Sequence, residues 1–420
     1  MSSNVFGERF DTLDVLRGVA VLGIFWMNVL AFGLPWAAYE NPTLALDLSG
    51  LDRSLWIFSE LFVEGSMRAL FCLLFGVSLL ILTDPARRSA VDPGREYLWR
   101  AGWLVVFGLV HGYLLLWPGD ILLYYGIAGL LLFGLRQATP AVWLTWAAAL
   151  AAVSTLLTVS VFAGYAWLAA EVGPMVAGEA TPSDSGLVEA YEDMRAMLLP
   201  DAEALAAELE QRRGGYLDNL AFAVETRNSL LFNPIVLAIF LTDSMFFMLI
   251  GMALYRFGIL TGAAPMSVYA VFAVGGYAVG LVVNGWETHG MLVSEFDPAA
   301  WVYQSTYHLG RFAIVIGHVG LVIGLWKLGA GGWLGRRLAR VGRMALTNYI
   351  AQSVLAALIF TGLGLGLVGR LSLTQLIAVV IIVWIVQIAL SDWVIGRFGR
   401  GPLEVAWRWL VRRSMGSSAA

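Results

Sequence analysis

Apolar residues stand in blocks of bilayer-spanning length that recur along the whole chain. A transmembrane helix needs roughly 17 to 25 predominantly apolar residues, and blocks of about this length or more can be traced from one end of the sequence to the other. They cover residues 12–34, 54–82, 97–117, 120–136, 141–170, 233–257, 267–286, 301–326, 344–368 and 373–396. Their length and number predict an all-α fold, a polytopic membrane helix bundle with about ten transmembrane helices.

The composition agrees with a membrane protein and excludes several other classes. Hydrophobic residues make up 59% of the chain and charged residues 13%, and the mean hydropathy is +0.76, far from the usage of soluble domains. A net charge of -4 gives no reason to expect a nucleic-acid partner. Because Cys72 is the only cysteine, an intramolecular disulfide and a cysteine-based zinc or iron–sulfur site are excluded, and no metal site is expected.

The distribution of arginine predicts how the chain is oriented. Short loops rich in Arg and Lys stay in the cytoplasm. Arginines gather after the second, eighth and tenth blocks: Arg87, Arg88 and Arg95; Arg336, Arg337, Arg340 and Arg343; Arg397, Arg400, Arg408, Arg412 and Arg413. The connections 118–119 and 287–300 hold no basic residue. This alternation predicts that both termini face the cytoplasm.

The blocks divide the chain into four expected segments. Residues 1–170 would hold the first five membrane helices, and residues 233–396 the second five. Residues 171–232 are long and acidic and are expected outside the cytoplasm, either as a small helical cap or as a solvated loop. Residues 397–420 are predicted to form an amphipathic helix on the cytoplasmic surface, with tryptophans at the membrane interface.

Charged side chains inside the apolar blocks point to function, because a charge at the centre of a membrane helix costs roughly 2.5 to 3.5 kcal/mol. Glu60, Glu64 and Arg68 recur every four residues in the second block and would share one face of a helix. Two interpretations stay open. The stripe is either an internal ion pair that holds helices together or the wall of a polar cavity.

Two histidine-bearing blocks supply groups for proton chemistry. His111 lies in the outer half of the third block, followed at the next turn by Asp120, while His308 and Arg311 stand together in the eighth block and Asp243 near the middle of the sixth. A histidine can accept a proton near neutral pH, although a single buried histidine is about as often a packing group. Together these residues predict a polar chamber open to the outside.

Another polar group lies at the cytoplasmic ends of two blocks. Asp14 and Arg17 begin the first block, and Asn28 shares a helical face with Arg17 because eleven residues make almost three turns. Taken alone, Asp14 and Arg17 would be a helix-start carboxylate and a positive-inside anchor. The ninth block opens with a polar run that includes Gly342, Arg343, Thr347, Asn348 and Gln352.

Several motifs spread over nearly the whole chain carry a family resemblance. They are Leu13-Asp14-Val15-Leu16-Arg17-Gly18 with Asn28, Phe75-Gly76, Phe107-Gly108-Leu109-Val110-His111 with Gly119-Asp120-Ile121-Leu122, Gly342-Arg343-Met344-Ala345-Leu346-Thr347-Asn348-Tyr349 with Gln352-Ser353, and Gly401-Pro402-Leu403-Glu404. They resemble the YeiB-like family of bacterial membrane proteins of unassigned function, which implies a multi-pass protein of the cytoplasmic (inner) membrane. Through its first motif and Asn28 the chain is also distantly similar to the transmembrane acyltransferases, including the lysosomal heparan-sulfate acetyltransferase.

The second resemblance implies transfer of an acyl group across the membrane. The donor would be cytoplasmic acyl-CoA such as acetyl-CoA, acting as a co-substrate and not as a tightly bound cofactor. The acceptor would be a hydroxyl or amine of a small molecule or glycan on the far side. The resemblance assigns the CoA end to Arg17, Arg343, Thr347 and Asn348, and arginine suits phosphate recognition.

The same resemblance assigns the chemical step to His111 as the base, oriented by Asp120, with Asn28 or Arg68 stabilising the oxygen on which charge develops. The remaining expected binding residues are Asp14, Glu64, His308 and Arg311. The chain departs from the heparan enzyme in one respect. That enzyme has a histidine after the first-helix asparagine, whereas residues 35–39 here have none, so the base must come from another helix.

Other functions stay open beside the acyltransferase, so enzymatic activity itself is undecided. A transporter or proton-coupled permease could use the same buried groups, although the two halves show no internal repeat of the kind many transporters have. A non-catalytic envelope protein is a third reading. Hydrolase and ATPase motifs such as GxSxG and the P-loop are missing from the sequence. The glycines at 362, 364 and 366 permit close helix contact, as in a homodimer, without identifying a dimer face.

Overall fold

The computed structural model describes residues 11–84, 92–176, 185–330 and 332–416. Over these residues every regular element is helical, which confirms the predicted all-α membrane bundle. Seven segments are long and apolar enough to cross a bilayer: α1 (Asp11–Gly33), α2 with α3 (Gly50–Phe62, Ser66–Thr83), α6 (Pro140–Val176), α10 (Pro234–Arg256), α11 (Met266–Val293), α12 with the 3-10 helix before it (Tyr307–Lys327, Pro298–Thr306) and α15 (Leu373–Phe398). Arg87 and Arg88, expected in a cytoplasmic loop, lie outside the described residues.

The number of spans among the described residues differs from the ten expected. Helices α13 (Gly332–Arg343) and α14 (Ala345–Phe360) qualify together as one span bent by 82°, which raises the count to eight. Helix α4 (Pro93–Leu109) is charged in its first two turns, and α5 (Leu122–Leu132) is short, so neither reaches the length and apolarity of a span by itself. These two helices pack against each other.

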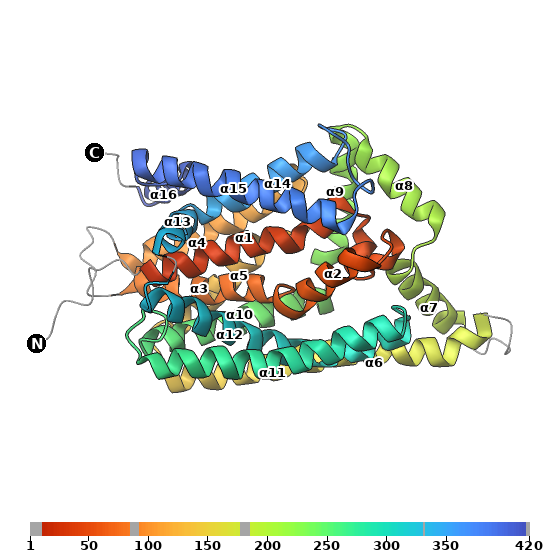
Figure 1. The fold of residues 1–420 in the computed structure, drawn as a ribbon, viewed down its shortest axis with the longest axis horizontal. Helices are drawn as coiled ribbons and strands as arrows, with labels where there is room; N and C mark the ends of the chain where they lie inside the picture. The colour runs from red at the N-terminus through yellow and green to blue at the C-terminus, as the bar shows by residue number, and fades with distance from the viewer. Residues whose placement is uncertain (1–10, 85–91, 177–184, 331, 417–420) are drawn as a thin grey trace, which may run out of the picture.

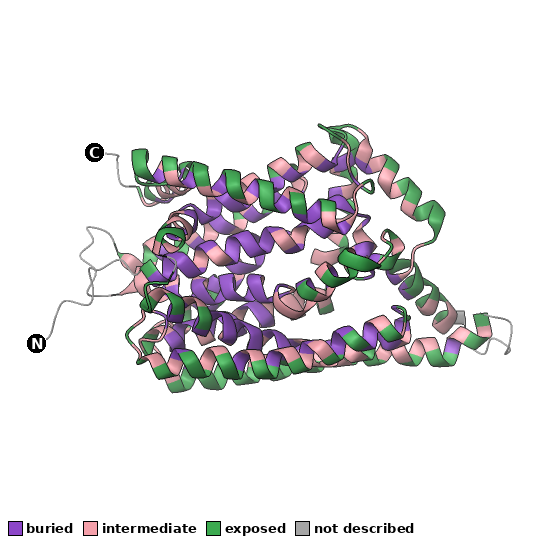
Figure 2. Ribbon diagram, in the orientation of Figure 1, coloured by how far each residue is buried: buried purple, intermediate pink, exposed green. Residues whose placement is uncertain are grey.

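The helices are arranged around α1, which runs through the middle of the bundle and is buried along most of its length (Figures 1 and 2). Helices α6 and α11 lie along one side with most of their surface exposed, and α14 and α15 lie along the opposite side. Glycines allow the closest approach at one end. A Cβ on Gly342 would lie 1.9 Å from the Asp14 carbonyl oxygen, and one on Gly18 would lie 2.0 Å from that of Leu338. Backbone contact between α1 and α13 therefore sets the neighbourhood of Arg17 and Arg343.

The predicted second helix is broken in the middle. Gly65 has a φ of +59° and separates α2 from α3. A Cβ at this position would lie 2.3 Å from the Tyr307 hydroxyl and 2.5 Å from the Arg311 side chain, so α12 occupies the space that a regular turn with a larger residue would need. The break also undoes the expected i,i+4 pairing of Glu64 with Arg68, because Arg68 pairs with a carboxylate of α10 instead.

The acidic segment between the two halves contains α7 (Ser185–Leu198), α8 (Ala202–Arg213) and α9 (Tyr216–Leu231). Helix α8 ends beside the last turn of α1, whose carbonyl groups have no partner within their own helix. Arg212, which is 4% exposed, donates from Nη2 to the carbonyl oxygens of Ala31 and Phe32, both at 2.8 Å, and from Nη1 to that of Leu34 at 2.6 Å. This arginine fixes the cap helices to the central helix.

Replacing Arg212 with alanine is therefore expected to lower the free energy of unfolding by about 2–4 kcal/mol, because it leaves buried carbonyl groups without donors. The loss would appear as a lower midpoint when the purified protein is unfolded by heat or denaturant in detergent. Arg195→Ala provides the control, since Arg195 is exposed on α7 and its removal should change stability by less than about 0.5 kcal/mol. Equal midpoints for the two variants would contradict the capping role.

Candidate functional site

His111 stands at the centre of a fully buried chain of three side chains. It lies in a π turn (Val110–Leu114) that follows α4, a local irregularity often found at functional sites. Its Nδ1 is 2.8 Å from Oδ1 of Asp120, and its Nε2 is 2.8 Å from Oγ of Ser353 on α14. All three residues are no more than 1% exposed. The expected neighbourhood of His111 and Asp120 is thus observed, and a serine completes it.

The partners of Asp120 decide which ring nitrogen carries the proton. Its Oδ2 accepts the amide hydrogen of Leu123 at 3.0 Å and lies 3.7 Å from Nη2 of the buried Arg227 on α9. With a guanidinium beside it, the carboxylate is an acceptor. In the neutral tautomer that donates from Nδ1 to this carboxylate, Nε2 accepts the hydroxyl hydrogen of Ser353. A nucleophile, a base and an orienting carboxylate are arranged in this order in acyl-transfer enzymes of unrelated folds.

No role could be assigned to Ser353 from the sequence, where it is only part of a family motif. A serine inside an apolar helix usually bonds to its own backbone. The one available signal was the polar run on α14 that begins at Thr347. The structure extends this run into a buried ladder, in which Gln352 donates to Gln387 of α15 at 3.0 Å, and Gln387 donates to the carbonyl oxygen of Asn348 at 2.9 Å.

A small pocket lies beside the segment that joins His111 to Asp120. Residues of this segment, of the end of α1, of the cap and of α14 line it, among them Phe32, Leu116, Trp117, Arg212, Phe222 and Ala357. Leu116 has a φ of +61°, an uncommon conformation for a residue that is not glycine. The buried indole N–H of Trp117 interacts with the hydroxyl group of Tyr349, whose ring in turn packs edge-on against that of His111.

A second buried network surrounds Asp243 on α10. Its Oδ2 accepts from Arg68 at 3.0 Å, and its Oδ1 accepts from Arg311 and lies 3.4 Å from Nδ1 of His308. The other ring nitrogen of His308 is 2.9 Å from the Thr158 hydroxyl. The sequence placed these residues in a chamber, and the structure brings them together around one carboxylate.

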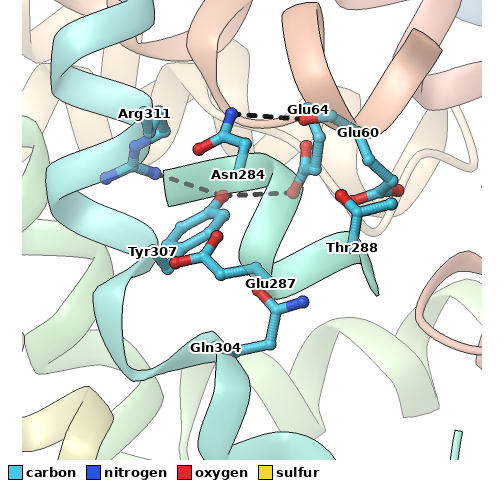
Figure 3. Close-up of a pocket in the computed structure, with 8 residues that line it drawn as sticks. All are labelled: Glu60, Glu64, Asn284, Glu287, Thr288, Gln304, Tyr307 and Arg311. Atoms are coloured by element: carbon cyan, nitrogen blue, oxygen red, sulfur yellow. Dashed lines mark hydrogen bonds between the residues drawn. The ribbon is translucent and has the colours of Figure 1, made fainter. Parts of the chain in front are cut away.

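Next to this network is a small pocket lined almost entirely by polar side chains (Figure 3). They are Glu60, Glu64, Asn284, Glu287, Thr288, Gln304, Tyr307 and Arg311. Tyr307 donates to Oε1 of Glu64 at 3.1 Å, and Tyr39 donates to its Oε2 at 3.3 Å. Burial, together with the carboxylate of Glu64, raises the pKa of Tyr39 well above its ordinary value, so this loop residue remains a donor.

The expected single chamber is wrong in one respect, because aromatic side chains stand between the two networks. Tyr124 stacks on Phe240 with ring centroids 4.9 Å apart. Arg227 of the His111 network lies over Tyr124 at 5.1 Å, and Arg68 of the Asp243 network lies over Phe240 at 5.2 Å. Arg68 therefore belongs to the Asp243 network, away from the base it was expected to assist. The position of a residue along its helix does not say which side chains pack between two helices.

At the opposite end of α1, the residues expected to bind CoA have partners within the protein. Asp14 accepts from Arg17 at 2.9 Å, and Arg343 donates to the carbonyl oxygen of Gly399 at 2.9 Å. The Thr347 hydroxyl donates to Glu404 at 2.6 Å, and Asn348 donates to Ser391 at 3.0 Å. Arg17 and Arg343 remain partly exposed, whereas Asn348 is buried and forms part of the ladder toward Ser353.

Helix α16 (Pro402–Ser414) makes specific hydrogen bonds with the rest of the bundle. Glu404 accepts the amide hydrogens of Leu346 and Thr347 at 2.9 and 3.1 Å, so it caps the first turn of α14. Trp407 donates to the carbonyl oxygen of Arg100 at 3.1 Å, and the Arg100 guanidinium lies over its ring. The C-terminal helix therefore ties α14 to α4, the two helices that carry Ser353 and His111.

Two further expectations concern single residues and metals. Asn28 is half-buried on α1, and its side chain makes no hydrogen bond with another described residue. Within the part of the chain that the structure describes, His, Cys, Asp and Glu side chains form no group of three or more that could hold a metal ion.

Comparison with known proteins identifies a family but assigns no activity to it. The model of the family described as "Protein of unknown function (DUF418)" matches residues 254–414. The uncharacterized protein YeiB of Escherichia coli (strain K12) is 32% identical over 412 residues, which is 97% of this chain and 98% of that protein. The uncharacterized protein YxaH of Bacillus subtilis (strain 168) is 31% identical over 147 residues, 34% of this chain and 36% of the relative.

Solved structures gave no significant match. The match to YeiB extends over nearly the full length of both chains, and the DUF418 match includes α12 to α16, with Ser353 among its residues. The chain therefore belongs to the YeiB-like, DUF418-containing family of multi-pass membrane proteins.

Proposed function

We propose that the protein is a transmembrane acyltransferase that moves an acyl group from cytoplasmic acyl-CoA to a hydroxyl or amine acceptor on the other side of the membrane. The observation that supports this best is the buried His111, held by Asp120 at Nδ1 and open to accept a proton at Nε2. Acyl transfer requires a base in this state, because the attacking hydroxyl or amine must lose a proton as the new bond forms. The arginine pattern favours a bacterial cytoplasmic membrane as its location.

The two substrates would approach from opposite ends of the bundle. The acceptor, a small molecule or a glycan, would enter the pocket beside Trp117, which is the wall nearest in sequence to both His111 and Asp120. The donor would bind with its phosphates near Arg17 and Arg343 and extend along the polar ladder of α14 and α15.

The proposal is tested by the binding of acyl-CoA. The unfolding temperature of the purified protein in detergent is measured with acetyl-CoA and with palmitoyl-CoA. A ligand at about 100 times its dissociation constant stabilises the folded state by about 2.7 kcal/mol, so a clear upward shift is expected in wild type and in His111→Ala. The shift should be absent in Arg17→Ala and kept in Arg195→Ala, whose exposed arginine lies on α7. Absence of any shift in wild type would contradict the proposal.

The pocket of Figure 3 favours a second candidate, a small-molecule transporter or proton-coupled permease. Glu60, Glu64 and Glu287 face a common space within the membrane region, and intramembrane carboxylates often mark substrate or proton pathways. If no acyl-CoA stabilises the wild-type protein, the transporter becomes the first candidate and a non-catalytic envelope protein the second. The two functions use different networks, so variants of each can be compared directly.

A further inference from the structure

We infer that Ser353 is the nucleophile of the reaction and carries the acyl group as a covalent ester between the two half-reactions. This rests on the proposed acyl transfer and adds the residue and the route to it. Direct transfer would need donor and acceptor at His111 together. A covalent intermediate allows the two substrates to reach the same atom one after the other, from different sides of the membrane.

The hydrogen bonding of Ser353 differs from that of three other serines in these helices, although Ser154 of α6 also lies 3.2 Å from a histidine nitrogen, Nε2 of His308. Ser59, Ser66 and Ser78 each donate to the carbonyl oxygen four residues earlier, at 2.8, 2.8 and 3.1 Å, as serines in apolar helices commonly do. Among the residues that the structure describes, the hydroxyl group of Ser353 instead has one hydrogen-bond partner, Nε2 of His111 on another helix. Its hydroxyl is therefore aligned with the base.

The same contact argues against direct transfer. Nδ1 of His111 is engaged with Asp120, so Nε2 is the one nitrogen that can take a proton, and Ser353 occupies it. An acceptor hydroxyl could reach this nitrogen only after Ser353 had moved away or reacted. Ser353 is 1% exposed and His111 is 0% exposed, so water has little access, and an ester at this position would be protected from hydrolysis.

Ser353 lies on α14 between the pocket beside Trp117 and the polar ladder shared with α15. Ala357 lies one turn beyond Ser353 and Thr361 two turns beyond, and both line the pocket beside Trp117. In the other direction, Asn348 and Gln352 continue the ladder toward Glu404. A thioester that arrives along the ladder and an acceptor that arrives through the pocket would meet the same hydroxyl oxygen from opposite directions.

The chemistry balances as two ordinary acyl transfers. In the first, Oγ of Ser353 attacks the thioester carbon, His111 takes the hydroxyl proton, the C–S bond breaks, and the thiolate leaves with that proton as free CoA. In the second, the acceptor oxygen or nitrogen attacks the ester carbon and passes its proton to His111. The C–O bond to Ser353 breaks, and His111 returns the proton to Oγ. Neither step needs an oxidant, a reductant or a metal.

The experiment traps the intermediate. Purified protein in nanodiscs of phosphatidylethanolamine and phosphatidylglycerol is mixed with acetyl-CoA, quenched in acid within seconds, and analysed by intact mass and peptide mapping, while free CoA is measured in parallel. Wild type is expected to gain the mass of one acetyl group on the peptide that contains Ser353. Ser353→Ala should gain none and release CoA at least 100-fold more slowly, whereas Ser78→Ala should match wild type. Ser353→Cys, which keeps a nucleophile, should become acetylated as well.

The outcomes separate this inference from the function on which it rests. Undiminished CoA release by Ser353→Ala, without acetylated protein, would overturn the covalent route and leave a direct acyltransferase. Acetylation mapped to a peptide without Ser353 would overturn the assignment of the nucleophile. If wild type neither becomes acetylated nor releases CoA, both the inference and the proposed function are wrong. Unchanged unfolding temperatures in Ser353→Ala and Ser353→Cys establish that any loss does not come from misfolding.

Discussion

Replacing His111 with alanine is expected to lower the rate of acyl-group loss from acetyl-CoA by about 10²- to 10⁴-fold, the usual contribution of a positioned general base. The alanine leaves Ser353 without an acceptor for its proton, since the histidine ring is the only hydrogen-bond partner of its hydroxyl group within the described part of the chain. The rate is followed as release of free CoA thiol by the protein in phosphatidylethanolamine and phosphatidylglycerol vesicles, whose headgroups offer amines and hydroxyls.

His289→Ala serves as the matched control, because His289 is exposed near the end of α11 and should leave the rate within about twofold of wild type. Asp120→Asn should also be slow, since an amide oxygen at this position holds the Nδ1 proton less firmly than a carboxylate does. Equal rates for His111→Ala and His289→Ala would remove His111 from the chemistry. Acyl-CoA binding by His111→Ala should persist, which distinguishes a lost base from a lost fold.

Replacing Asp243 with asparagine is expected to lower the free energy of unfolding by about 3–5 kcal/mol, the typical cost of removing one partner from a buried ion pair. Asp243 is 2% exposed and is shared by Arg68 and Arg311. Without the carboxylate, both guanidinium groups lose the ion-pair partner that they share in this largely buried site. The loss is measured from the midpoint of thermal or denaturant unfolding in detergent.

Asp392→Asn is the control for this second prediction. Asp392 also faces two arginines, Arg337 and Arg340, but its side chain is 30% exposed. Ion pairs in contact with water contribute about 0–1 kcal/mol, so this variant should unfold close to wild type. A small effect of Asp243→Asn, comparable with that of Asp392→Asn, would mean that the arginines are hydrated or reorganise. The Asp243 network would then be less rigid than its geometry indicates.

The regular helices could be predicted from the sequence with small errors. The blocks 12–34, 233–257 and 373–396 correspond to α1, α10 and α15 within about two residues. These boundaries are readable because the length of an apolar segment must match the bilayer. The break at Gly65 was not readable, because its cause is the side chains of Tyr307 and Arg311, which lie more than two hundred residues further along the chain.

The candidate site could likewise be predicted only in part from the sequence. Residue type and depth suggested that His111 and Asp120 act together, since both lie close to one tight turn. Depth also grouped Asp243, His308 and Arg311, which do share a network. What could not be predicted is that Tyr124 and Phe240 separate these residues from His111, because the filling of space between helices depends on all neighbours at once.

The sequence by itself determined that the chain is a helical membrane bundle of the YeiB-like family, because the apolar blocks must match the bilayer and the motifs are local. Only the tertiary structure decided that Ser353 completes the His111 and Asp120 pair. The serine lies 242 residues from the histidine, and spacing along one helix says nothing of the helix that packs opposite. The packing of α14 against the turn after α4 brings the hydroxyl to the ring, and there the chemistry becomes testable.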